Sequence, residues 1–89
     1  MRLQGKVAIV TGGGAGLGKA IAHRLAEEGA DVVIGDTDET AAQAVAAQIQ
    51  ALGSRAAAVR TDVTRKSEIE ALVEQAMQLG PIDILINNA

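Results

Sequence analysis

The sequence predicts an α/β fold with a parallel sheet, and two observations support that prediction. Short apolar runs with strand composition alternate with segments whose apolar residues recur at helical spacing, in the order β-α-β-α-β-α-β. Glycine or a glycine-proline pair follows each helical segment, where a chain commonly leaves a helix. The expected strands span residues 6–10, 31–35, 55–60 and 82–87.

The first expected strand, residues 6–10, runs into the glycine-rich octet TGGGAGLG at residues 11–18. A helical segment follows, with apolar residues at positions 17, 21 and 25. A strand, a glycine-rich turn and a helix in this order place backbone N–H groups where they can bind a pyrophosphate. The octet therefore predicts a nucleotide site.

The glycines of the octet are expected to have separate roles. Gly12 allows a sharp turn at the end of the strand, where positive φ favours glycine. Gly16 leaves room for a phosphate at the first helical turn, whose free N–H groups and positive dipole end favour an anion. Gly18 allows the helix to pack closely on its strand.

The second expected strand, residues 31–35, ends in Asp36, about twenty residues beyond Gly16. A carboxylate there can accept hydrogen bonds from both hydroxyls of an adenosine ribose. Its alternative role is to cap the next helix, although Thr37 or Asp38 can provide that cap. Apolar residues at positions 41, 45, 49 and 52 predict the helix itself.

The third expected strand, residues 55–60, precedes Asp62, which can either line a site or cap the next helix. Thr64 is the predicted N-cap of that helix, whose apolar residues lie at positions 69, 72, 73 and 76. Carboxylates on the helices, Glu68 among them, are expected to be solvated. The fourth strand, residues 82–87, has the composition of a strand buried on both faces.

Right-handed crossovers then predict the sheet order 3-2-1-4. The first two helices are expected on one face of this sheet and the third on the opposite face. The glycine octet lies where the strand order reverses, which is the usual place for a ligand in such folds.

Composition limits the function classes. The net charge is −3 with interspersed signs, which argues against a nucleic-acid surface. The apolar runs are too short to span a bilayer, no secretory signal is visible, and we expect a cytoplasmic location with no membrane partner. Cysteine is absent, and no residue spacing suggests a metal site.

Three motifs occur at matching strand ends. The octet fits Thr-Gly-x-x-x-Gly-x-Gly, Asp62-Val63 follows the third strand, and the sequence ends in Asn87-Asn88-Ala89. Together they resemble the amino-terminal half of a short-chain dehydrogenase/reductase, over essentially all 89 residues. The resemblance implies one domain, residues 1–89, forming a three-layer Rossmann-like half.

The resemblance also implies an NAD site. The octet would border the pyrophosphate and nicotinamide, and Asp36 would hold the ribose. Asp62 and Val63 would contact the adenine edge, and Asn88 and Ala89 would form the floor beneath the cofactor. NADP-preferring members usually carry Arg or Lys where this sequence has Ala15 and Thr37, so NAD is the expected cofactor. The expected cofactor-binding residues are Gly12, Gly14, Gly16, Leu17, Gly18, Asp36, Thr37, Asp62, Val63, Asn88 and Ala89.

The sequence departs from the family in lacking tyrosine. Family members use a Tyr-x-x-x-Lys pair and a serine, all downstream of the Asn-Asn-Ala segment, and the tyrosine hydroxyl acts as acid or base. We therefore expect no catalytic residue in this chain, which we interpret as a fragment or an engineered half of an oxidoreductase. Turnover would require a second chain that supplies the missing residues.

Two other hypotheses concern binding and assembly. Residues 13–19 also spell the start of a P-loop, but Ala20 stands where Ser or Thr would hold magnesium, which disfavours an NTPase. An apolar fourth strand at a sheet edge, beside a face with one helix, predicts a homodimer through that edge or face. The alternative function is accordingly a self-associating structural unit with little cofactor binding.

Overall fold

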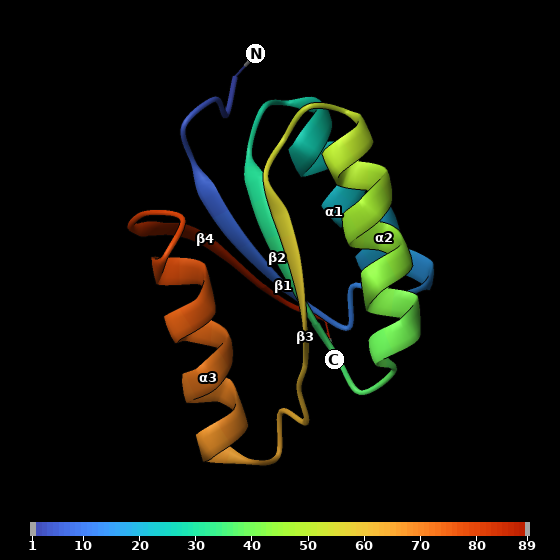
Figure 1. Cartoon of the computed structure of the whole chain (residues 1–89), viewed down its shortest axis with the longest axis vertical. Coiled ribbons are helices and arrows are strands. Elements are labelled where there is room, and N and C mark those ends of the chain that lie inside the picture. The colour runs from blue at the N-terminus through green and yellow to red at the C-terminus, as the bar shows by residue number, and fades with distance from the viewer. Residues whose placement is uncertain (1, 89) are drawn as a thin grey trace.

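The computed structural model describes residues 2–88 and contains the seven predicted elements in the predicted order (Figure 1). The strands are all parallel, and the sheet order is β3-β2-β1-β4, as the crossover argument predicted. The elements are β1 (Val7–Thr11), α1 (Gly16–Glu27), β2 (Asp31–Asp36), α2 (Glu39–Ala51), β3 (Ala56–Arg60), α3 (Lys66–Met77) and β4 (Ile82–Asn87).

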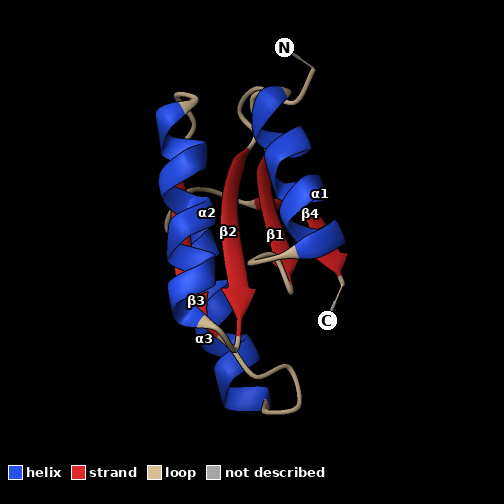
Figure 2. Cartoon of the chain, turned by 90° about the vertical axis from the view of Figure 1, so that its right-hand side faces the viewer, coloured by secondary structure: helices blue, strands red, loops and turns tan. Residues whose placement is uncertain are grey.

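The helices lie on the two faces of the sheet as expected. Helices α1 and α2 cover one face, and α3 covers the other (Figures 1 and 2). Alternate residues of the strands point to opposite faces, so Ala8 and Val10 pack under α1 and α2 while Val7 and Ile9 pack under α3. The core under α1 and α2 comprises Ala8, Val10, Ala22, Ala26, Ala30, Val32, Ile34, Ala42, Val45, Ala46 and Ile49.

The helix starts correct one prediction. Asp38 is the N-cap of α2, and its Oδ1 accepts the N–H of Ala41 at 3.0 Å. Thr64 does not cap α3, because Arg65 occupies the N-cap position and makes no side-chain cap bond. Thr64 instead donates its hydroxyl and its N–H to Asp62 Oδ1, at 2.6 and 2.9 Å, in a turn that precedes the helix.

The exposure of β4 agrees with its predicted place at a sheet edge beside the face with one helix. This strand alternates half-buried and exposed residues, and Leu85 is 65 % exposed, although its composition is that of a strand buried on both faces. Within residues 2–88, β4 pairs with β1 alone, and the register shifts so that Asp83 is skipped. The Asp83 carboxylate accepts the N–H of Val7 at 3.0 Å at this irregularity.

Candidate functional site

The glycine loop, residues 12–18, connects the carboxyl end of β1 to α1. Gly12 has φ +65° and donates its N–H to the carbonyl of Gly35 at 2.7 Å, so the chain turns sharply just after the strand. Gly16, the first residue of α1, has φ +57°, and a Cβ built on it would meet nothing within 4 Å. The space beside the Cα of Gly16 is therefore open at the start of α1, where helix N–H groups favour an anion.

Close packing holds the first turn of α1 against the start of the loop. A Cβ on Gly18 would collide with the carbonyl oxygen of Gly12 and lie 2.7 Å from Asn88 Nδ2. The same Asn88 amide donates to the Gly12 carbonyl at 3.3 Å. Glycine at position 18 thus lets α1, the loop and the end of β4 meet.

Asp36 lies beside the loop at the carboxyl end of β2. Its Oδ2 accepts the N–H of Gly14 at 2.9 Å, and its Oδ1 accepts the N–H of Asp38 at 2.9 Å. The capping alternative is therefore partly right, because Asp36 binds the backbone before α2 while Asp38 provides the cap itself. The carboxylate remains half-buried, with one side open to solvent.

A depression of about 90 Å³ adjoins the loop and Asp36. It joins residues from the ends of β1, β2 and β3, which lie far apart in the sequence, and brings Asp36, Asp62 and Val63 to one edge of the sheet. Its lining residues are Gly12, Gly35, Asp36, Thr37, Thr61, Asp62 and Val63.

Asp62 is held by two groups of Thr64. The hydroxyl and the N–H of Thr64 donate to Asp62 Oδ1 at 2.6 and 2.9 Å, and these hydrogen bonds, the hydroxyl's above all, lower the pKa of the Asp62 carboxyl below its ordinary value. The carboxylate is therefore ionised at neutral pH.

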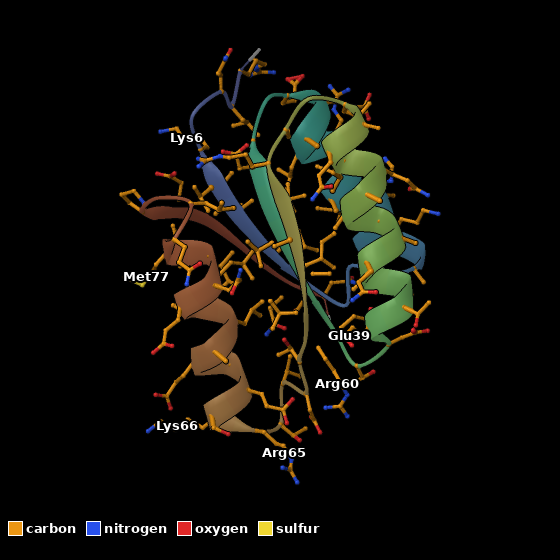
Figure 3. All side chains as sticks on the ribbon, viewed as in Figure 1. Lys6, Glu39, Arg60, Arg65, Lys66 and Met77 are labelled. Carbon is orange, nitrogen blue, oxygen red and sulfur yellow. The ribbon has the colours of Figure 1, made fainter. Side chains whose placement is uncertain are left out.

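The sequence position of Glu68 predicted a solvated side chain, but its carboxylate has partners within the protein. Its Oε1 accepts the N–H of Asp62 at 2.9 Å, and its carboxylate pairs with Arg60 at 3.7 Å and Arg65 at 3.8 Å. The signal in the sequence was a glutamate in the first turn of a helix, whose side chain commonly binds a backbone N–H just upstream. Arg60, Arg65, Lys66 and Glu39 surround this end of the molecule, far from Lys6 (Figure 3).

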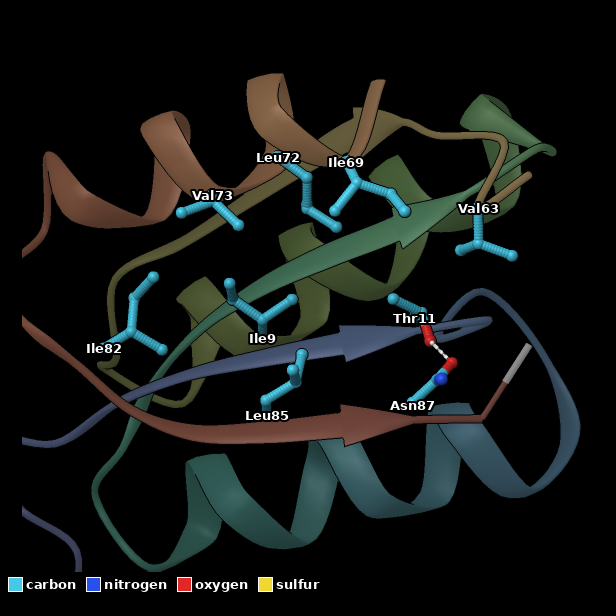
Figure 4. A pocket seen from close by; sticks show the side chains of 9 residues that line it. All are labelled: Ile9, Thr11, Val63, Ile69, Leu72, Val73, Ile82, Leu85 and Asn87. Atoms are coloured by element: carbon cyan, nitrogen blue, oxygen red, sulfur yellow. Dashed lines mark hydrogen bonds between the residues drawn. The ribbon is translucent and has the colours of Figure 1, made fainter. Parts of the chain in front are cut away.

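The polar residues at the end of β4 are paired with Thr11. The buried Thr11 hydroxyl donates to Asn87 Oδ1 at 3.1 Å and accepts the N–H of Asn88 at 3.0 Å (Figure 4). Asn88 is thereby fixed next to the glycine loop, as the motif predicted. Ala89, the other predicted floor residue, lies outside the described residues.

A second, larger cavity of about 340 Å³ lies on the opposite face, between α3 and β4 (Figure 4). Its lining is mostly apolar and includes none of the glycines of the loop. This cavity was not predicted from the sequence, although the apolar run of the fourth strand indicated an apolar surface here. The lining residues are Ile9, Thr11, Val63, Ile69, Leu72, Val73, Ile82, Leu85 and Asn87.

Within residues 2–88, no group of three or more His, Cys, Asp or Glu side chains is arranged to hold a metal ion. In the same part of the chain, every helix is too short or too polar to cross a membrane.

The sheet order and the site define a class of protein. A parallel sheet in the order 3-2-1-4, a glycine loop at the switch point and a carboxylate after the second strand are typical of dinucleotide-binding α/β folds. The chain belongs to the short chain dehydrogenase family, whose model matches residues 6–89.

Relatives of known structure support the fold and the family. The chain is 50 % identical to 7alpha-hydroxysteroid dehydrogenase of Escherichia coli K12, over all of this chain and 35 % of that protein. It superimposes on a 7 alpha-hydroxysteroid dehydrogenase complexed with NADH and 7-oxo glycochenodeoxycholic acid at TM-score 0.90 and 49 % identity, over 94 % of this chain and 33 % of the other. A short chain dehydrogenase of Burkholderia cenocepacia in complex with NADP gives TM-score 0.95 and 48 % identity, over 100 % and 37 %. The chain spans about a third of the length of the curated relatives it matches.

Proposed function

We propose that this chain is the dinucleotide-binding part of a short-chain dehydrogenase/reductase and binds the adenosine and pyrophosphate of NAD. The main support is the juxtaposition of the glycine loop with Asp36 and Asp62 at one edge of the sheet. Two similar structures, with about half of their aligned residues identical to this chain, were solved with NADH and with NADP. A nicotinamide dinucleotide is therefore the ligand class that fits the site.

The residues present suit such a ligand. A pyrophosphate would lie at the start of α1, where helix N–H groups favour an anion and the space beside Gly16 is open. Asp36 would accept the ribose hydroxyls, with Thr37 beside it, and Asp62 and Val63 would contact the adenine edge. Gly12, Gly14, Leu17 and Gly18 would complete the loop side of the site, and Asn88 and Ala89 its floor. When bound, the dinucleotide would supply hydride chemistry.

We propose a preference for NAD over NADP. A 2′-phosphate would bring added negative charge next to the Asp36 carboxylate, and repulsion at that distance disfavours binding. Ala15 and Thr37 provide no cation at the positions where a basic side chain would offset this repulsion.

We also propose that these 89 residues do not transfer hydride by themselves. The family's acid-base tyrosine has no counterpart here, because the sequence contains no tyrosine. An active oxidoreductase would need residues beyond these 89, and turnover after addition of a polypeptide that carries them would test whether this chain can form part of one.

Affinity measurements test the proposal. NAD and NADP are titrated calorimetrically into the wild-type chain, the Asp36→Ala variant and the Glu39→Gln variant, which removes one exposed negative charge at the start of α2. We expect NAD to bind the wild type and Glu39→Gln similarly, Asp36→Ala about tenfold or more weakly, and NADP more weakly than NAD. Absence of NAD binding to a folded wild-type chain would refute the proposal.

A second candidate function is self-association of this chain into a homodimer. Leu85 is 65 % exposed on β4, whose outer side is unpaired within residues 2–88, and the apolar cavity lies beside it. An unpaired apolar strand edge favours pairing with another copy. Sedimentation at micromolar concentrations should reveal a dimer, whereas a monomer that unfolds cooperatively would contradict this candidate.

A further inference from the structure

We propose that Asp36 is a positioning residue for the glycine loop, which it holds against the start of α2 before any nucleotide binds. Its Oδ2 accepts the N–H of Gly14, and its Oδ1 accepts the N–H of Asp38, each at 2.9 Å. One carboxylate thus joins a backbone segment that precedes α1 to a segment that precedes α2.

The packing around Gly14 supports this role. A Cβ built on Gly14 would lie 2.8 Å from Asp36 Oδ2, 3.0 Å from Ala41 Cβ and 3.2 Å from Ala42 N. Gly14 does not have a positive φ, so its backbone conformation does not require glycine. Glycine at this position is explained by the close approach of the loop to Asp36 and α2.

The carboxylate keeps acceptors for a ligand. An ionised carboxylate has about four acceptor positions, and the two backbone N–H groups use one on each oxygen. About two remain, which equals the number of hydroxyls on a ribose; this step rests on the proposed function. The same side chain therefore positions the loop and presents the acceptors that the ribose would use.

An amide cannot replace this carboxylate. Asparagine has one accepting oxygen and one donating nitrogen, so Asp36→Asn can retain at most one of the two backbone hydrogen bonds. Glu39→Gln is the matched control, because it removes the same charge from an exposed residue at the start of α2. The other charged groups at this end of β2 are Asp38 on the same segment, and Arg60 and Asp62 at the end of β3.

The test uses the nucleotide-free chain and NMR. The carboxyl carbon of Asp36 and the amide proton of Gly14 are followed through an acid titration of the wild type, which requires no variant to fold. We expect both signals to move with one midpoint, and the same behaviour in Glu39→Gln. In Asp36→Asn the Gly14 amide should no longer titrate. In Asp36→Ala, which removes both acceptor oxygens, it should exchange with solvent about tenfold faster, as expected for loss of a hydrogen bond to a charged group.

Two results would overturn the positioning role: a Gly14 amide signal that does not move with the Asp36 carboxyl signal in the wild type, or equal Gly14 exchange rates in Asp36→Ala and Glu39→Gln. Titration of NAD into the same samples separates this inference from the proposed function. If Gly14 follows Asp36 but NAD does not bind, the positioning role stands and the proposed function fails. If NAD binds but the Gly14 amide signal does not follow the Asp36 titration, only the positioning role fails.

Discussion

The face of the sheet under α1 and α2 buries more than twice as many residues as the face under α3, although both faces belong to the same strands. Two helices cover the first face, whereas α3 leaves an apolar cavity of about 340 Å³ beside β4 (Figures 2 and 4). On this first face, the hydrogen bond from Gly14 to Asp36 and the close packing of Gly14 on α2 connect the glycine loop to both. Nucleotide binding and self-association should therefore be separable by mutation.

The largest expected effect is a loss of unfolding free energy, measured by truncating one buried aliphatic side chain on each face. Ile49→Ala and Leu72→Ala both remove core atoms, and such truncations cost about 2–5 kcal/mol of unfolding free energy. Ile49 should lie near the upper end, because it is enclosed by the core under α1 and α2. Leu72 should lie near the lower end, because it already borders a cavity. Chemical denaturation measures both, and an equal or larger loss for Leu72 would contradict the comparison.

A smaller loss of stability is expected when the hydrogen bonds from Thr11 on β1 to Asn87 and Asn88 are removed. Thr11→Val keeps the side-chain shape but leaves Asn87 Oδ1 and the Asn88 N–H without this partner, at a cost of about 1–3 kcal/mol. Thr40→Val, at an exposed position of α2, is the control. Denaturant titration of both variants makes the measurement, and equal stabilities would show that the Thr11 hydrogen bonds contribute little.

Leu85→Lys should alter association more than stability. The side chain is mostly exposed, so the unfolding free energy should change by no more than about 0.5 kcal/mol. A lysine on an edge strand opposes pairing with a second copy, so the sedimenting species should shift to the monomer. Leu52→Lys, exposed at the end of α2, should leave assembly unchanged. Loss of the dimer in both variants, or in neither, would argue against the β4 edge as the interface.

The smallest effect concerns the pKa of Asp62, which Thr64 lowers. A lowered carboxyl pKa stabilises the folded state above the ordinary Asp value of about 3.9, and this contribution disappears as the pH falls through the folded-state pKa. Thr64→Ala removes the hydroxyl and should raise the Asp62 pKa toward its ordinary value. An NMR titration of the Asp62 carboxyl carbon measures the change, with Thr40→Ala as control, and an unchanged value would rule out the hydroxyl as the cause.

The sequence predicted the fold well because each element is determined locally. The apolar period, the glycine stops and the crossover rule predicted the strand order, and the observed strand bounds differ from the expected ones by one residue or none. Five of the predicted site residues line one depression for the same reason, since parallel strands end at one edge of the sheet: Gly12, Asp36, Thr37, Asp62 and Val63.

The failed predictions depend on three-dimensional contacts. Thr64 was expected to cap α3, but its N–H and hydroxyl bind the Asp62 carboxylate in a turn before the helix, and Arg65 occupies the N-cap position. Glu68 was expected to be solvated, but folding brings it to the backbone of Asp62.

A residue-resolved NMR titration of NAD into the wild-type chain tests most directly whether the nucleotide site is independent of the α3 face. We expect shifts concentrated in residues 12–18, at Asp36 and at Asp62, with none at Val73 or Leu85. The Leu85→Lys monomer should show the same shifts at the same NAD concentrations. Shifts centred on the cavity beside α3, or none at all in a folded sample, would contradict the account.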